Sequence, residues 1–131
     1  MRLLLSCSLV LVTLCFSARA EHPPVVIDYF YEAGCADCAK VRNQILPDLK
    51  ERFEGFYVIN NHDVGIRTNV IRLVAYQEKL QIKKNDPVLM VVDNQYVFNG
   101  FDAVKAGLLG RWMNVLPGVR KQDGSRRRPL R

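Results

Sequence analysis

Two cysteines separated by two residues are the feature of this sequence that could do chemistry. They stand in the run Gly34-Cys35-Ala36-Asp37-Cys38. At the start of a helix, this spacing puts both sulfurs on the same side, one turn apart and close enough for a short disulfide. The unpaired N–H groups of a helix N-terminus stabilise a thiolate on the first cysteine. We therefore predict that Cys35 is the attacking thiolate. Cys38 is then the resolving thiol, whose attack on a mixed disulfide releases the partner protein.

The same pair could instead belong to a metal site, a haem site or an inert disulfide. Zinc needs four ligands, and only His22 and His62, with an Asp or Glu, could supplement the cysteines. A c-type haem needs a histidine directly after the second cysteine, where this chain has Ala39, so that site is excluded. A structural disulfide stays open, although so short a loop constrains the unfolded chain little. We expect redox chemistry, with no metal and no cofactor.

Residues 1–20 have the three parts of a secretory signal peptide. Arg2 is followed by a mostly apolar run over 3–18, which closes on Ala18-Arg19-Ala20. We predict cleavage after Ala20 and export, to a periplasm or out of the cell, where two neighbouring thiols are normally oxidised. An uncleaved membrane anchor and lipidation at Cys7 are the alternatives. Cleavage would also remove Cys7 and Cys15, leaving Cys35 and Cys38 as the cysteines of the mature chain.

Length, composition and charge point to one small domain with a basic tail. The 131 residues are 49% hydrophobic and 24% charged, which excludes wholesale disorder and a collagen-like chain. Of the net charge of +6, the tail over 118–131 holds six basic residues and one acid, or +5, whereas the predicted domain over 21–117 is at −1. We expect a disordered tail that either solvates the terminus or attracts an anionic membrane surface or acidic partner. The domain has no basic patch interleaved with aromatic residues, so nucleic-acid binding is not expected.

Alternating strand and helix patterns follow the leader. The predicted elements are a strand over 25–30, a helix over 38–53, a strand over 56–60, a helix over about 66–80, strands over 88–92 and 96–98, and a helix over 101–115. Pro47 should kink the first helix. In the second helix Ile66, Val70 and Val74 are expected to face inward, with Leu73 as a further candidate. Residues 61–63 are expected to form a loop that exposes His62.

The order β-α-β-α-β-β-α predicts an α/β fold with a four-stranded mixed sheet and helices on both faces. Two β-α-β crossovers predict parallel strands, and the closing hairpin adds one antiparallel edge. The uninterrupted apolar run Val88-Leu89-Met90-Val91-Val92 predicts a strand that is buried on both faces.

Three segments resemble the thioredoxin-like superfamily over about residues 25–115. The segment from Phe30 to Cys38 is similar to that family's strand-to-CxxC segment, and Asp86-Pro87 before the apolar run resembles its cis-proline. Asn99-Gly100-Phe101-Asp102 is similar to the glycine-containing turn before the last helix. The resemblance implies a cis Pro87 lying against the disulfide. It also implies that the backbone of Asp86 pairs with an extended substrate peptide.

The sequence departs from the family in ways that affect the chemistry. Gly34 stands where thioredoxin has a tryptophan, and the position of its buried acid falls on Tyr29. Asp28 is one residue away and should point to the opposite face of the sheet. Glu32 or Asp37 could then assist proton transfer to Cys38. The Pro-Tyr dipeptide that glutaredoxins carry between the cysteines is missing, so glutathione binding is not expected.

The sequence thus predicts an exported thiol-disulfide oxidoreductase whose partners are protein thiols or disulfides. Because Asp37 opposes the field that favours a thiolate at Cys35, we expect a reductant or an isomerase-like protein rather than a strong oxidant. The alternative is a thioredoxin-fold binding module whose disulfide is inert.

Overall fold

A mixed four-stranded sheet forms the centre of the molecule in the computed structural model, which describes residues 23–84 and 86–113. The strands are β1 (Val25–Tyr31), β2 (Tyr57–Asp63), β3 (Val88–Val92) and β4 (Tyr96–Asn99), in the sheet order β2-β1-β3-β4. The predicted signal peptide over 1–20 and the basic tail over 118–131 lie outside the described residues.

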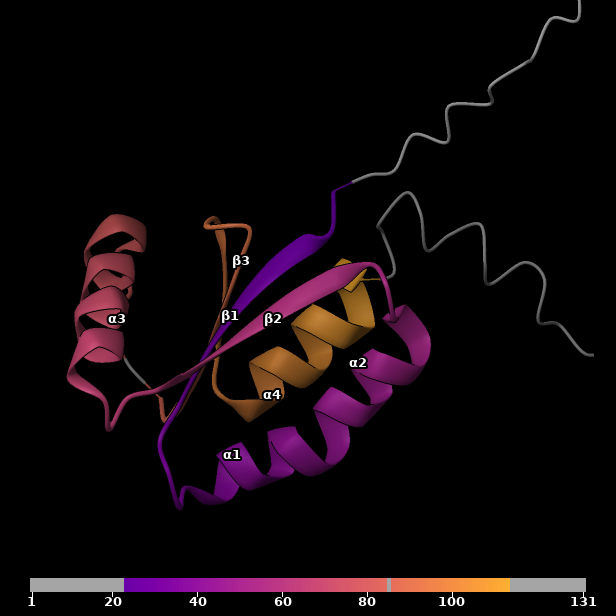
Figure 1. The fold of residues 1–131 in the computed structure, drawn as a ribbon, viewed down its shortest axis with the longest axis horizontal. Helices are drawn as coiled ribbons and strands as arrows, with labels where there is room; N and C mark the ends of the chain where they lie inside the picture. The colour runs from indigo at the N-terminus through magenta and orange to yellow at the C-terminus, as the bar shows by residue number, and fades with distance from the viewer. Residues whose placement is uncertain (1–22, 85, 114–131) are drawn as a thin grey trace, which may run out of the picture.

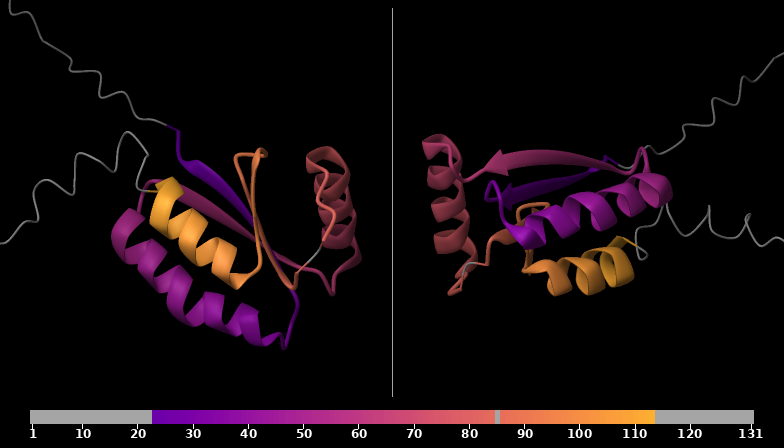
Figure 2. Two further views of the ribbon diagram at one scale, coloured as in Figure 1. Left: turned by 180° about the vertical axis from the view of Figure 1, so that it is seen from behind. Right: turned by 90° about the horizontal axis from the view of Figure 1, so that it is seen from below.

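Helices cover both faces of this sheet, as Figures 1 and 2 show. One face carries a continuous helical segment of α1 (Ala36–Lys40), the π-helical turn η1 (Val41–Ile45) and α2 (Leu46–Phe53), together with α4 (Phe101–Ala103) and the π-helical η2 (Val104–Trp112). The other face carries α3 (Arg67–Leu80). The predicted α/β class, element order and two helical layers are therefore confirmed. None of the helices in these two ranges has the length and apolar character needed to cross a membrane.

The direction of β3 corrects the prediction that both crossovers join parallel strands. β1 is parallel to β2 but antiparallel to β3, with Tyr31 paired to Val88. Gln81 ends α3 in the left-handed conformation, at φ 53°. The following segment then leads to β3 at the carboxyl end of β1, so β3 runs back along β1. Because β2 is parallel to β1, β3 is antiparallel to β2 as well. The connection through α3 is therefore not a crossover between parallel strands.

The helical segment after the cysteines buries the predicted stripe. Its four apolar residues at intervals of four are each at most 1% exposed: Val41, Ile45, Leu49 and Phe53. Pro47 has no N–H, and its ring crowds the preceding turn. The helix accommodates it in the wider turn η1, where the N–H of Leu46 donates to the carbonyl of Val41, five residues earlier.

Strand β2 is longer than predicted, because residues 61–63 are strand rather than loop. Asn61, His62 and Asp63 pair in parallel register with Tyr29, Phe30 and Tyr31. Their polar side chains disfavour a strand locally, but pairing with β1 overrides that preference. The extension places His62 inside the fold, where it is 9% exposed, so the expectation that it is solvated is wrong. The predicted strand over 88–92, by contrast, is confirmed as buried along its whole length.

The rotation of α3 about its axis differs from the prediction. Ile66, Val70 and Val74 are 54%, 37% and 43% exposed, whereas Leu73 and Tyr76 are buried against Phe30 of β1. Leu80 continues that inward row, so the helix packs through positions 73, 76 and 80. The hydroxyl of Tyr76 can be buried because it donates to the buried carboxylate of Asp28.

This orientation predicts unequal costs for truncating apolar side chains on α3. Leu73→Ala should lower the free energy of unfolding by about 2–4 kcal/mol, because it leaves a cavity in a packed layer. Val70→Ala and Val74→Ala should each cost less than about 1 kcal/mol, because those side chains keep much of their contact with water. Chemical denaturation of the three variants measures the difference. Equal costs at Leu73 and Val70 would contradict the observed rotation.

Candidate active site

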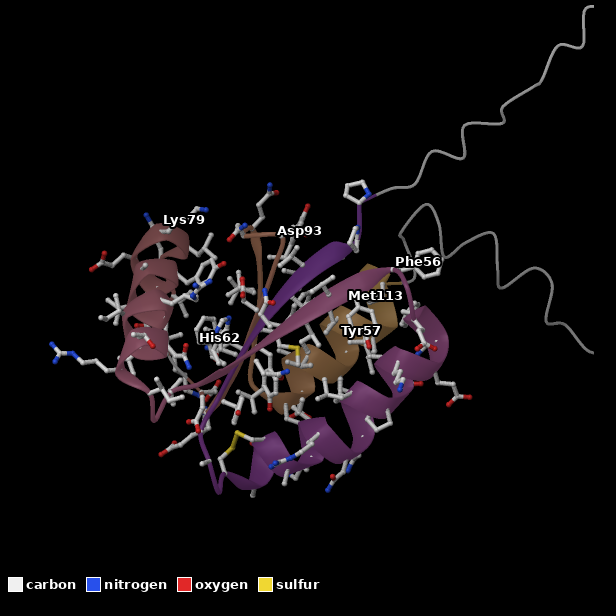
Figure 3. The ribbon with its side chains drawn as sticks, viewed as in Figure 1. Phe56, Tyr57, His62, Lys79, Asp93 and Met113 are labelled. Atoms are coloured by element: carbon white, nitrogen blue, oxygen red, sulfur yellow. A yellow bond between two sulfur atoms is a disulfide. The ribbon has the colours of Figure 1, made fainter. Side chains whose placement is uncertain are left out.

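The two cysteines form a disulfide at the start of α1, the yellow bond in Figure 3. Their Cα atoms are 5.3 Å apart. Cys35 is partly exposed, whereas Cys38 is 1% exposed and belongs to the core on the α1 side of the sheet. A partner thiol can therefore approach the sulfur of Cys35 far more readily than that of Cys38.

The turn before α1 sets the position of Cys35. The N–H of Cys35 donates to the carbonyl of Glu32 at 3.3 Å, and Gly34 within this turn has φ +84°. Only glycine adopts that conformation without strain, which explains a glycine in front of the first cysteine. Cys35 then caps the helix, because its sulfur accepts a hydrogen bond from the N–H of Cys38 at 2.9 Å. When the disulfide is reduced, that same N–H is placed to stabilise a Cys35 thiolate.

The Asp86–Pro87 segment lies against the second cysteine. The carbonyl oxygen of Pro87 is 3.5 Å from the sulfur of Cys38. The peptide bond before Pro87 is trans, since the described residues contain no cis peptide bond, so the expected cis-proline is corrected. For a bond to proline the two forms differ by only about 0.5–1 kcal/mol, and resemblance in sequence does not decide between them.

The turn before α4 fixes this segment in place. The N–H of Asp86 donates to the side-chain oxygen of Asn99 at 3.0 Å. Gly100 has φ +89°, and a Cβ there would meet a carboxylate oxygen of Asp86 at 3.2 Å. The glycine therefore allows the carboxylate to approach the backbone closely, as well as supplying the conformation of the turn.

A cleft of about 310 Å³ opens beside the disulfide, between α1, the Asp86–Pro87 segment and the start of α4. Its charged lining consists of Asp37, Lys40, Asp86 and Asp102. Asp37 forms an ion pair with Lys40 at 2.7 Å, and the amine of Lys40 also lies 5.5 Å from the ring centre of Phe101. The hydrogen bond and charge of Asp37 hold the pKa of Lys40 above its usual value. Lys40 therefore remains cationic and offsets part of the charge of Asp37 next to the disulfide.

Neither of the two acids considered for proton transfer to Cys38 lines the cavity that contains Cys38. Asp37 is half-exposed and directed into its pair with Lys40. Glu32 is exposed and lines a cavity of about 130 Å³ between Leu73 of α3 and the Asp86–Pro87 segment. Among the β1 residues in the core cluster of Cys38, Tyr29 is 4% exposed and also lines a cavity with Cys38.

A buried polar cluster on the α3 side of the sheet was missed by sequence reasoning. Asp28 is 4% exposed, and its carboxylate accepts hydrogen bonds from His62 at 2.7 Å, Tyr76 at 2.7 Å and Asn60 at 3.2 Å. Figure 3 shows His62 between α3 and the sheet. Its ring stacks on that of Phe30 at 4.7 Å. The sequence signal was an acid within a buried strand, which needs partners of this kind.

The environment of this cluster sets the ionisation of two of its members. Burial alone would raise the pKa of Asp28, but hydrogen bonds from His62, Tyr76 and Asn60 and the charge of His62 outweigh it, so that pKa lies below 3.8. Burial and the bond to Asp28 raise the pKa of Tyr76 to about 12. Asp28 is therefore an anion and Tyr76 a proton donor across the neutral range.

The positions of Asp28 and His62 decide two predictions, one on the direction of Asp28 and one on a metal site at the cysteines. Asp28 points to the face opposite Tyr29, as predicted, and so has no access to Cys38. His62 faces the same way and cannot join the cysteines in a metal site. Across residues 23–84 and 86–113, no group of three or more His, Cys, Asp and Glu residues is arranged to hold a metal ion.

No protein-family model matches this sequence, and no curated protein matches it either. The assignment to an α/β fold with a four-stranded mixed sheet follows from the strand order and layers of the chain itself. Among solved structures, the chain is similar to glutaredoxin 1 from Francisella tularensis complexed with cacodylate. The two share 17% sequence identity with a TM-score of 0.39, over 64% of this chain and 92% of that one.

Proposed function

We propose that this protein is a thiol-disulfide oxidoreductase that acts on protein thiols or disulfides through Cys35 and Cys38. The observation that carries the proposal is the asymmetry of the pair. Cys35 is partly exposed and caps a helix through the N–H of Cys38, whereas Cys38 is buried directly behind it. A nucleophile that a substrate can reach and a second thiol that it cannot reach are what the two steps of disulfide exchange need.

The exchange runs from the reduced pair. The thiolate of Cys35 attacks one sulfur of a substrate disulfide, forming a mixed disulfide and expelling the other substrate sulfur as a thiolate, which takes a proton from water. Cys38 then loses its proton and attacks the sulfur of Cys35, which breaks the mixed disulfide and expels the second substrate sulfur. The substrate gains two electrons, and Cys35 and Cys38 end as a disulfide. An external dithiol donor returns two electrons to the pair.

The Asp86–Pro87 segment is where an extended substrate peptide would lie. The N–H of Asp86 is already bonded to Asn99, so the carbonyl of Asp86 is its backbone group for a substrate N–H. Pro87 is exposed and next to Cys38, so a peptide along this segment would bring its own disulfide to Cys35. Strand addition of this kind recognises backbone rather than side chains, which suits a protein that acts on several partners.

The acid within the motif supports a reductant or isomerase-like role. Asp37 is two residues from Cys35, and its charge opposes the formation of a thiolate there by about 0.3–1 kcal/mol, an effect that Lys40 reduces. Strong oxidants owe their potential to a stabilised reduced thiolate. We also propose that the chain works after export, on the basis of the leader-like pattern of residues 1–20; an oxidising compartment would supply disulfide substrates.

Trapping tests this proposal. In the full chain carrying Cys7→Ser, Cys15→Ser and Cys38→Ser, the reduced protein should form a stable mixed disulfide with oxidised insulin, because the resolving thiol is absent. Peptide mapping by mass spectrometry should place the adduct on Cys35. The matched control is the same chain with Cys35→Ser and Cys38 retained, which should form little adduct because Cys38 is buried. Equal labelling of the two variants would contradict the assigned roles.

A further inference from the structure

A third cavity, distinct from the cleft, is lined by the buried cysteine Cys38 itself. It has a volume of about 120 Å³, and Tyr29, Tyr31, Cys38, Arg42, Leu46 and Asn61 line it. Tyr29 and Cys38 are buried, whereas Arg42 and Asn61 are exposed, so the cavity leads from the sulfur-bearing core toward the surface. Arg42 follows Cys38 by four residues along a continuous helical segment, which puts both side chains on one face of it.

The resolving step places a demand on this part of the molecule. Cys38 must become a thiolate to attack the mixed disulfide, and a buried thiolate loses the hydration that stabilises it in water. The carbonyl oxygen of Pro87, 3.5 Å from the sulfur, presents a negative dipole end to it and gives no help. The groups that line the cavity with Cys38 are the ones considered next as sources of stabilisation.

Two side chains that line this cavity, Arg42 and Tyr29, can stabilise a thiolate at Cys38. Arg42 carries a permanent positive charge. Burial raises the pKa of Tyr29 to about 12, and the charge of Tyr31 raises it further. The charge of Arg42 lowers the same pKa, so the guanidinium is close enough to affect the phenol. Tyr29 therefore keeps its proton at neutral pH and can donate it in a hydrogen bond.

The charged groups at the outer cleft are engaged elsewhere and do not take the place of Arg42 and Tyr29. Asp37 and Lys40, on the helix of Cys38, pair with each other at the outer cleft. Across that cleft, Asp86 pairs with Lys84 at 3.0 Å and Asp102 is exposed. Tyr31 on β1, Leu46 on α2 and Asn61 on β2 complete the lining of the cavity.

We propose that Arg42 and Tyr29 stabilise the Cys38 thiolate from this cavity, Arg42 by its charge and Tyr29 by donating a hydrogen bond. The inference rests on the proposed exchange reaction and identifies what promotes its second step. The proton of Cys38 leaves to water through the open side of the cavity. The thiolate then attacks Cys35, and the expelled substrate thiolate takes a proton from water.

Titration of a single thiol tests the proposal. The full chain with Cys7→Ser, Cys15→Ser and Cys35→Ser retains only Cys38, and its thiolate is followed by ultraviolet absorbance against pH. Arg42→Gln should raise the pH midpoint of thiolate formation by about one unit, and Arg42→Lys should restore most of the shift. Tyr29→Phe keeps the buried ring and should raise the midpoint by a smaller amount.

A matched control removes a cation from the same helical segment. Arg52 pairs with Asp48 at 3.1 Å on α2 and does not line the cavity, so Arg52→Gln should leave the midpoint unchanged. An unchanged midpoint in Arg42→Gln, with a cooperative melt showing that the variant is folded, would overturn the proposal. The titration uses no substrate, so its result stands apart from the proposed function, which fails if the unmodified protein reduces no protein disulfide.

Discussion

Replacing Cys35 by serine should lower the rate of insulin disulfide reduction by about a thousandfold or more, which corresponds to about 4 kcal/mol of transition-state stabilisation. A serine hydroxyl does not ionise near neutral pH, so the group that caps α1 would no longer be a nucleophile. Cys38 could not take over, because it is 1% exposed behind Cys35. The assay measures turnover with an excess of a dithiol donor, whose background rate is subtracted.

Two further variants serve as controls for the Cys35→Ser result. Cys7→Ser with Cys15→Ser should turn over at the rate of the unmodified chain, because those residues have no place in the proposed reaction. Cys38→Ser should lose turnover yet still form one adduct per molecule, which separates the resolving step from the attacking step. If Cys35→Ser reduced insulin within about twofold of the parent rate, the assigned nucleophile would be wrong.

The largest effect on stability is expected at Asp28. Asp28→Ala should lower the free energy of unfolding by about 3–5 kcal/mol at neutral pH, because it removes a buried anion and leaves the buried His62 without its acceptor, whereas the Tyr76 hydroxyl keeps its contact with Asn94. Asp48→Ala is the matched control: it removes an acid whose pair with Arg52 is solvent-exposed, and it should cost less than about 1 kcal/mol. Chemical denaturation measures both variants. Equal costs would contradict a structural role for the cluster.

The same cluster predicts how stability depends on acid. The pKa of Asp28 lies below 3.8 in the folded chain, so between the unfolded and folded values the unfolded state binds the proton more readily. The stability that Asp28 contributes is therefore present above about pH 4 and is lost as the pH falls through the folded value. Asp28→Asn should remove this part of the acid dependence, which thermal melts from neutral to acidic pH would show.

Features that depend on a single segment could be predicted from the sequence. The stripe Val41, Ile45, Leu49 and Phe53 repeats every four residues, and β3 is an apolar run that nothing interrupts. The spacing of the cysteines at a helix start was likewise enough to predict a disulfide on the first turn. In each case local pattern and tertiary burial favour the same structure.

Features that depend on two distant segments could not be predicted. The direction of β3 depends on the path after Gln81, and the strand character of residues 61–63 depends on the register with β1. Asp28 and His62 are 34 residues apart, and only that register brings them together. The rotation of α3 follows from the same cluster, because the hydroxyl of Tyr76 donates to Asp28 and turns Val70 and Val74 outward.

The reduction potential of the Cys35–Cys38 couple tests the central claim most directly. Equilibration of the folded chain with thiol–disulfide buffers, followed by alkylation and mass spectrometry, gives the fraction of the pair that is reduced at each buffer ratio. We predict a reversible two-electron transition between about −270 and −180 mV, the range of reducing and isomerising proteins. A pair that stays oxidised below about −300 mV would identify an inert disulfide and contradict the proposed function, and a potential near −120 mV would contradict the reductant or isomerase-like role.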